Sequence, residues 1–97
     1  MTSRDFEVQR ALGTLSMQTI LKLAHARKNS MKIWRCLVEC HDNEINKILS
    51  KNSFTPICIL NELANDSSWD IVVNVAYNVH TRRKEYNEKI KLTAEIQ

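Results

Sequence analysis

Residues 61 to 82 read NELANDSSWDIVVNVAYNVHTR, and this stretch decides the fold of the chain. Its segment DIVVNVAY, residues 70 to 77, contains enough β-branched side chains for a strand. An Asp-Ser-Ser triplet directly precedes Trp69, however, and these residue types are preferred at the N-terminal caps of helices. We therefore predict a helix from about Trp69 to Asn78, with Asn78 as a left-handed exit.

The size and composition of the chain favour one small helical domain. A chain of 97 residues buries a single core, so we expect one domain over residues 1–97. One Gly and one Pro are too few for the turns of an all-β protein, which favours an all-α fold. The N-terminus lacks the basic and apolar regions of a leader, and no run of about 18 apolar residues occurs. We expect a soluble, cytoplasmic protein without a membrane segment.

Capping residues and apolar residues at helical spacing divide the rest of the chain into further short helices. These helices are expected from Ser3 to Leu12 with Gly13 as C-cap, after Ser16, after Ser30, after Asp42, after Thr55 with Pro56 in the first turn, and from Arg82 onward behind a Thr81 cap. Together with the helix that begins near Trp69, they make about seven helices.

The helices repeat with a period of 26 residues, as the column Leu23, Leu49 and Val75 shows. Other columns keep the same register: Ala24, Ser50 and Ala76 are small; Ala26, Asn52 and Asn78 end a helix; Asn29, Thr55 and Thr81 precede the next; Trp34, Leu60 and Tyr86 are large. The repeated unit has two helices. Stacking such units buries a continuous core that no single unit could bury.

These residues resemble the variant leucine-rich repeat, a family related in architecture to HEAT-like α-solenoids. Its unit reads roughly Leu-Ala-x-Asp-x-x-Trp-x-Val-Arg-x-x-Val-Ala-x-Asn-Pro-x-Thr-Pro, and the matching residues are Leu63, Ala64, Asp66, Trp69, Ile71, Val75, Ala76, Asn78 and Thr81. Val72 replaces the family's Arg, while Ser53, Val79 and Arg82 replace its Pro residues. The resemblance implies a short right-handed α-solenoid of about seven helices, which is a binding scaffold with no particular chemistry.

The residues that could carry chemistry do not form a convincing set. Cys36, Cys40 and His41 lie close in sequence, but a structural zinc site needs four ligands with paired short spacings. Neither His25 nor the other histidines stand beside an evident nucleophile. We expect no metal, no cofactor and no enzymatic activity. Without a secretory signal the cysteines should be reduced thiols, with Cys36 and Cys58 as small core residues.

Charge is unevenly distributed along the chain. Residues 8 to 38 carry six basic and no acidic side chains, whereas residues 39 to 70 carry six acidic and two basic ones. This asymmetry either reflects solvated helix faces or steers an association. A nucleic-acid-binding module is therefore the alternative function, with phosphate contacts from Lys22, Arg27, Lys28, Lys32, Arg35, Arg82 and Arg83. The acidic middle of the chain argues against it.

Protein binding fits the remaining features of the sequence. Trp34 and Trp69 are either core residues, which the family pattern favours, or exposed anchors of an interface. Polar residues on the second helix of each unit would line a concave recognition surface. The candidate partner-binding residues are Trp34, Arg35, Asn46, Asp70, Asn74 and Tyr77. We expect a non-catalytic protein-interaction module.

Two further expectations concern assembly and role. The exposed ends of so short a stack allow a homodimer through an end helix. A chain rich in Asn, Ile and Lys is also typical of AT-rich phage and mobile-element genes, which favours a small regulator or inhibitor.

Overall fold

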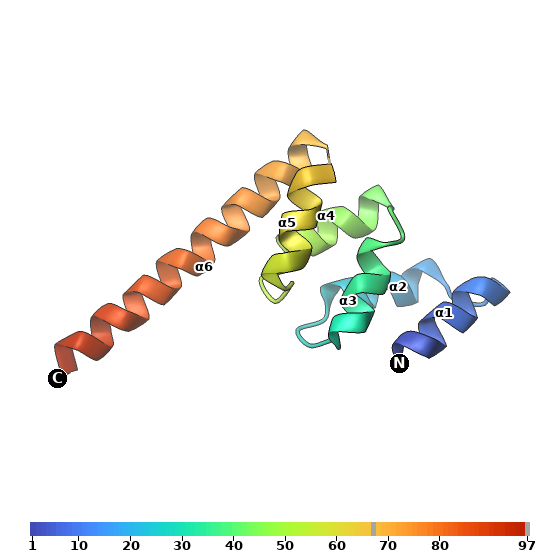
Figure 1. Cartoon of the computed structure of the whole chain (residues 1–97), viewed down its shortest axis with the longest axis horizontal. Helices are drawn as coiled ribbons and strands as arrows, with labels where there is room; N and C mark the ends of the chain where they lie inside the picture. Colours follow the sequence, from blue (N-terminus) through green and yellow to red (C-terminus); the bar gives the residue numbers. More distant parts are fainter. Residues whose placement is uncertain (67, 97) are drawn as a thin grey trace.

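The computed structural model describes residues 1–66 and 68–96, with side chains for 1–65 and 68–90, and these residues form helices joined by loops, without a strand (Figure 1). Its helices are α1 (Ser3–Leu12), α2 (Met17–His25), α3 (Met31–Val38), α4 (Asn43–Lys51), α5 (Ile57–Asp66) and α6 (Trp69–Ile96). The all-α prediction is therefore confirmed. None of these six helices combines the length and the apolar character needed to cross a membrane.

The helices form two layers. Helices α2, α4 and α6 contact one another in succession, and so do α1, α3 and α5. Contacts of α3 with α4 and of α5 with α6 join the layers. Three of the helices begin at the predicted caps. Ser16, Ser30 and Asp42 each accept a hydrogen bond from a backbone N–H in the first turn of the following helix. Gly13 ends α1 in the left-handed conformation, at a φ of 72°.

Helix α6 corrects the predicted division of the C-terminal region. One helix runs from Trp69 to Ile96, so the described chain has six helices where the sequence predicted about seven, and Asn78 is not a helix exit. The predicted break is missing because no Pro or Gly occurs within α6, and position 79, where a proline would interrupt the helix, is Val79. The hydroxyl of Thr81 donates to the carbonyl of Tyr77 at 2.9 Å, which is a bond within the helix.

The expected cap of α6 is only partly described. Its triplet comprises Asp66, Ser67 and Ser68. The carbonyl of Ser68 accepts a hydrogen bond from the N–H of Val72 at 3.1 Å, as expected for the residue directly before a helix. Ser67 and the side chain of Asp66 lie outside the described residues.

The core contains side chains from all six helices. Its buried apolar residues are Phe6, Ile20, Ala24, Ile33, Trp34, Cys36, Leu37, Val38, Ile45, Leu49, Ile59, Leu60, Leu63, Ile71 and Val75. The large residues Trp34 and Leu60 are both buried, whereas Tyr86, the third member of their column, is 64% exposed. The C-terminal half of α6 extends away from the other helices (Figure 1). Core packing therefore ends within the first half of α6.

The 26-residue spacing recurs in hydrogen bonds between neighbouring helices of the α2–α4–α6 layer. The side-chain amide of Asn52 donates to the carbonyls of Ala24 and Ala26 at 2.8 and 2.9 Å. The side-chain amide of Asn78 donates to the carbonyls of Ser50 and Asn52, both at 3.0 Å. The two donors, Asn52 and Asn78, lie 26 residues apart, and each acceptor of Asn78 lies 26 residues after an acceptor of Asn52. These bonds attach the end of each helix in the α2–α4–α6 layer to the next helix of that layer.

A second pair of hydrogen bonds has the same period. Asn29 donates through its side-chain amide to the carbonyl of Leu23 at 2.8 Å. Thr55 donates through its hydroxyl to the carbonyl of Leu49 at 2.8 Å and is fully buried. The sequence predicted Thr55 as a helix cap and missed this bond to the preceding helix. Both residues satisfy a carbonyl near a helix end, where no N–H of the same helix is available.

Candidate functional site

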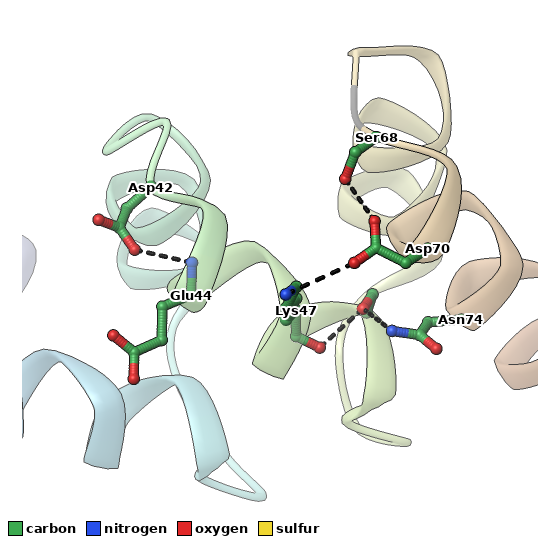
Figure 2. Close-up of polar contacts among 7 residues, drawn as sticks. Asp42, Glu44, Lys47, Ser68, Asp70 and Asn74 are labelled. Atoms are coloured by element: carbon green, nitrogen blue, oxygen red, sulfur yellow. Dashed lines mark hydrogen bonds and ion pairs between the residues drawn. The ribbon is translucent and has the colours of Figure 1, made fainter.

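Polar side chains connect α4 to the start of α6, as Figure 2 shows. The ammonium group of Lys47 lies 3.5 Å from the carboxylate of Asp70, which also accepts a hydrogen bond from the hydroxyl of Ser68 at 2.6 Å. That hydrogen bond is the main reason why the pKa of Asp70 lies below its ordinary value. The amide of Asn74 donates to the hydroxyl of Ser50 at 3.2 Å, and this hydroxyl donates to the carbonyl of Lys47 at 2.7 Å.

Four of the six predicted partner-binding residues lie on two helices that contact each other. Asp70, Asn74 and Tyr77 lie on α6, and Asn46 lies on the adjacent helix α4. Tyr77 is 74% exposed. Asn46 is half-buried, and its amide oxygen has no hydrogen-bond partner among the described residues. The accessible part of this set is therefore on α6.

The other two predicted residues lie on α3, in the second layer. Trp34 is only 3% exposed, so its prediction as a partner-binding residue is wrong and its alternative placement in the core is confirmed. It is buried because it shares the inward face of α3 with Leu37 and Val38, three and four positions on. Arg35 is exposed but forms an ion pair with Glu62 of α5, which raises the pKa of the arginine.

Trp69 lies outside the core, contrary to the prediction. Its side chain is 81% exposed. Trp69 precedes the buried Ile71 by two positions, which is about 200° around a helix, so the two side chains point in nearly opposite directions. Val73 and Tyr77 follow Trp69 at intervals of four residues and are 45% and 74% exposed. The three residues form an apolar row along α6, which we call the α6 row.

A groove of about 460 Å³ lies beside the α6 row, and we call it the α4–α6 groove. Its lining residues are Lys51, Ser53, Val73, Asn74, Tyr77, Asn78 and Thr81. Two members of the α6 row, Val73 and Tyr77, are part of this lining. The groove thus combines exposed apolar surface with the amide of Asn74.

A second groove, of about 490 Å³, separates α2 from the C-terminal end of α4, and we call it the α2–α4 groove. Its lining residues are His25, Arg27, Lys47, Ile48, Lys51, Asn52, Ser53 and Phe54. Three lysine and arginine side chains contribute to it, and none of its lining residues is acidic. The guanidinium of Arg27 lies 5.9 Å from the centre of the Phe54 ring, in cation–π geometry. Phe54 itself is 53% exposed.

The two grooves are lined by residues that lie 26 positions apart in the sequence. Six residues of the α2–α4 groove correspond, 26 positions later, to six of the α4–α6 groove: His25 to Lys51, Arg27 to Ser53, Lys47 to Val73, Ile48 to Asn74, Lys51 to Tyr77 and Asn52 to Asn78. The grooves themselves were not predicted from the sequence, although its 26-residue spacing predicts that two such positions correspond.

The predicted phosphate-binding residues lie on three helices and on the loop after α2. Lys22, Arg27 and Lys28 are exposed on α2 and the loop after it, Lys32 and Arg35 belong to α3, and Arg82 and Arg83 belong to α6. Arg82 is half-buried, and its guanidinium donates to the carbonyls of Thr55 and Asn52 at 2.6 and 3.0 Å. Burial lowers the pKa of Arg82. Arg82 is therefore a residue that connects α6 to the loop before α5.

The cysteines differ in accessibility. Cys36 is buried, as predicted, but Cys58 is exposed on α5, so its prediction as a core residue is wrong. Burial raises the pKa of Cys36 and of the half-buried Cys40. Within the described part of the chain, no three His, Cys, Asp or Glu side chains come together as a set that could hold a metal ion.

Comparisons with known proteins give no relative for this chain. No family model matches it, and neither the curated proteins nor the solved structures contain a match.

Proposed function

We propose that this protein is a non-catalytic protein-interaction module that binds its partner through the α6 row and the α4–α6 groove. The observation that carries the proposal is the exposure of Trp69, Val73 and Tyr77 in one row beside a groove. Aromatic residues are enriched in protein interfaces, and a few of them supply most of the binding free energy. Because Trp69 is 81% exposed, much of its apolar surface contacts water, and a bound partner would cover this surface.

The scaffold of this module is a short right-handed α-solenoid built from two-helix units. Two observations support it: the helices form two layers with contacts in succession, and the asparagine hydrogen bonds repeat every 26 residues. A scaffold of this kind presents a surface made of one helix per unit. A small module that covers a surface of its partner acts as a regulator or inhibitor.

Photo-crosslinking tests this function. A photoreactive amino acid is placed at Tyr77 or, as the control, at Tyr86, which is exposed on the same helix but outside the groove. Position 77 should crosslink a protein partner in the cells that make the chain, and position 86 should not. The purified partner should then bind Tyr77→Ala about thirtyfold more weakly than the wild type, as expected for the loss of an interface hot spot.

Equal crosslinking at both positions, or equal affinity of Tyr77→Ala and Tyr86→Ala, would contradict this binding surface. A second copy of the chain as the crosslinked protein would assign the surface to a homodimer.

A further inference from the structure

The two grooves occupy equivalent positions but differ in chemistry. Lys47 and Lys51 of the α2–α4 groove correspond to Val73 and Tyr77 of the α4–α6 groove. The first groove also contains Arg27 and no acidic residue in its lining, whereas the second is lined mainly by apolar and neutral polar side chains. Lys51 lines both grooves, so they adjoin at the C-terminal end of α4. One ligand can therefore contact both.

We propose that the partner presents an extended acidic segment, with carboxylates in the α2–α4 groove and a large apolar side chain in the α4–α6 groove. This inference rests on the proposed function and specifies the chemistry of the partner. Charge complementarity supports the first contact, because carboxylates pair well with the guanidinium of Arg27 and the ammonium of Lys51. The exposed surfaces of Val73 and Tyr77 support the second contact.

The repeat sets the spacing that the partner needs. Neighbouring helices of one layer lie about 8–10 Å apart, and equivalent grooves are displaced by the same distance. An extended chain advances about 3.3 Å per residue. The acidic residues of the partner should therefore lie about three positions from the apolar anchor.

The residues near the second groove favour a protein segment over nucleic acid. A phosphate chain that left the α2–α4 groove toward α6 would meet Val73 and Tyr77, and Lys51 is the single charged residue in the described lining of the α4–α6 groove. It would also pass near Asp70, whose carboxylate lies 3.5 Å from the ammonium of Lys47. Phosphate binding needs continued neutralisation along the backbone. Single-stranded nucleic acid that stacks on Tyr77 and Phe54 is the competing ligand, and the experiment distinguishes it.

Selection of random peptides displayed on phage against the immobilised full chain tests the inference. The selected sequences should be enriched in Asp and Glu, with one large apolar residue about three positions away. Fluorescence anisotropy should show that Arg27→Glu and Lys51→Glu each weaken binding of a selected peptide about tenfold or more. Lys22→Glu is the matched control, because Lys22 is exposed on α2 but lines neither groove; it should change the affinity less than about twofold. Thermal unfolding of each variant verifies that the fold is intact.

Three outcomes would overturn the inference. Selected peptides without acidic enrichment that still lose binding in Tyr77→Ala would overturn the acidic partner and leave the proposed function standing. Acidic peptides that bind all charge variants equally would place their contacts outside the α2–α4 groove. If no peptide is selected, and labelled oligothymidine binds with a steep salt dependence that Arg27→Glu and Lys51→Glu abolish, both the inference and the proposed function are wrong.

Discussion

The side-chain amide of Asn78 donates to the carbonyl oxygen of Asn52 at 3.0 Å, and Asn52 itself makes the equivalent bond to Ala26 one period earlier. The last carbonyls of a helix find no N–H donor within that helix. The side-chain amide of an asparagine from the next helix region of the α2–α4–α6 layer satisfies them, so Asn52 joins the end of α4 to α2 and Asn78 joins α6 to α4. The chain thus uses the same residue type for the same task at a fixed interval.

Replacing Asn78 should destabilise the fold. Asn78→Ala removes the donor to the carbonyl of Ser50, whereas the carbonyl of Asn52 still accepts from the guanidinium of Arg82, so we expect a cost of about 1–3 kcal/mol in the free energy of unfolding. Chemical denaturation followed by circular dichroism measures the change. Asn61→Ala is the control, because Asn61 is exposed on α5 and should change stability by less than about 0.5 kcal/mol. Equal stabilities of the two variants would show that the Asn78 amide contributes nothing.

The two tryptophans should differ in fluorescence. Trp34→Phe leaves only the exposed Trp69, and Trp69→Phe leaves only the buried Trp34. Acrylamide should quench Trp69 strongly and Trp34 weakly, and the emission of Trp69 should lie at longer wavelength because its ring contacts water. Similar quenching of both variants would contradict the exposure of Trp69 in the free protein.

A proline at position 79 should separate the two halves of α6. Val79→Pro removes a helix N–H and places the ring against the carbonyl of Val75, at a cost of about 3 kcal/mol. Val79→Ala controls for the lost side chain and should be the more stable variant. Far-ultraviolet circular dichroism and thermal unfolding measure helix content and stability. Unchanged helix content and stability in Val79→Pro, relative to Val79→Ala, would mean that a break already exists near Asn78.

The pH dependence of Asp70 should follow its hydrogen bond with Ser68. The pKa of Asp70 in the folded protein lies below its ordinary value of 3.8. Its contribution to stability is therefore complete above that value and is lost as pH falls through the folded pKa. Titration by nuclear magnetic resonance should place the Asp70 midpoint below 3.8 in the wild type and nearer to 3.8 in Ser68→Ala. The same midpoint in both proteins would exclude Ser68 as the main cause.

The three thiols should react in order of their exposure. Cys58 is exposed, Cys40 is half-buried and Cys36 is buried. Burial raises the pKa of Cys40 and Cys36, which lowers their reactive thiolate fraction. Maleimide labelling of the folded protein, read by peptide mass spectrometry, should modify Cys58 first and Cys36 last. Labelling in denaturant is the control, since all three thiols are then accessible. Early modification of Cys36 in the native protein would contradict its burial.

Local hydrogen bonds explain why the helix starts were predictable. The caps Ser16, Ser30 and Asp42 bond to N–H groups two or three residues away, so a short window of sequence contains the whole interaction. The exception was the helix start predicted at Arg82. The repeat pattern predicted a break between Asn78 and Arg82, although position 79 is Val79 and not a proline. An uninterrupted helix is the local preference of a segment without Pro or Gly.

The sequence by itself determined the helical class, the caps at Ser16, Ser30 and Asp42, and the 26-residue spacing of similar residues, because these depend on residue type and on spacing along the chain. Only the tertiary structure decided that Trp34 is buried while Trp69 is exposed. Apolar residues lie on more than one face of the first half of α6, so the sequence does not show which face is buried. The helices that pack against α6 bury the face that contains Ile71 and Val75. The grooves were decided in the same way, because each forms only where residues from two neighbouring helices and the loop beside them meet.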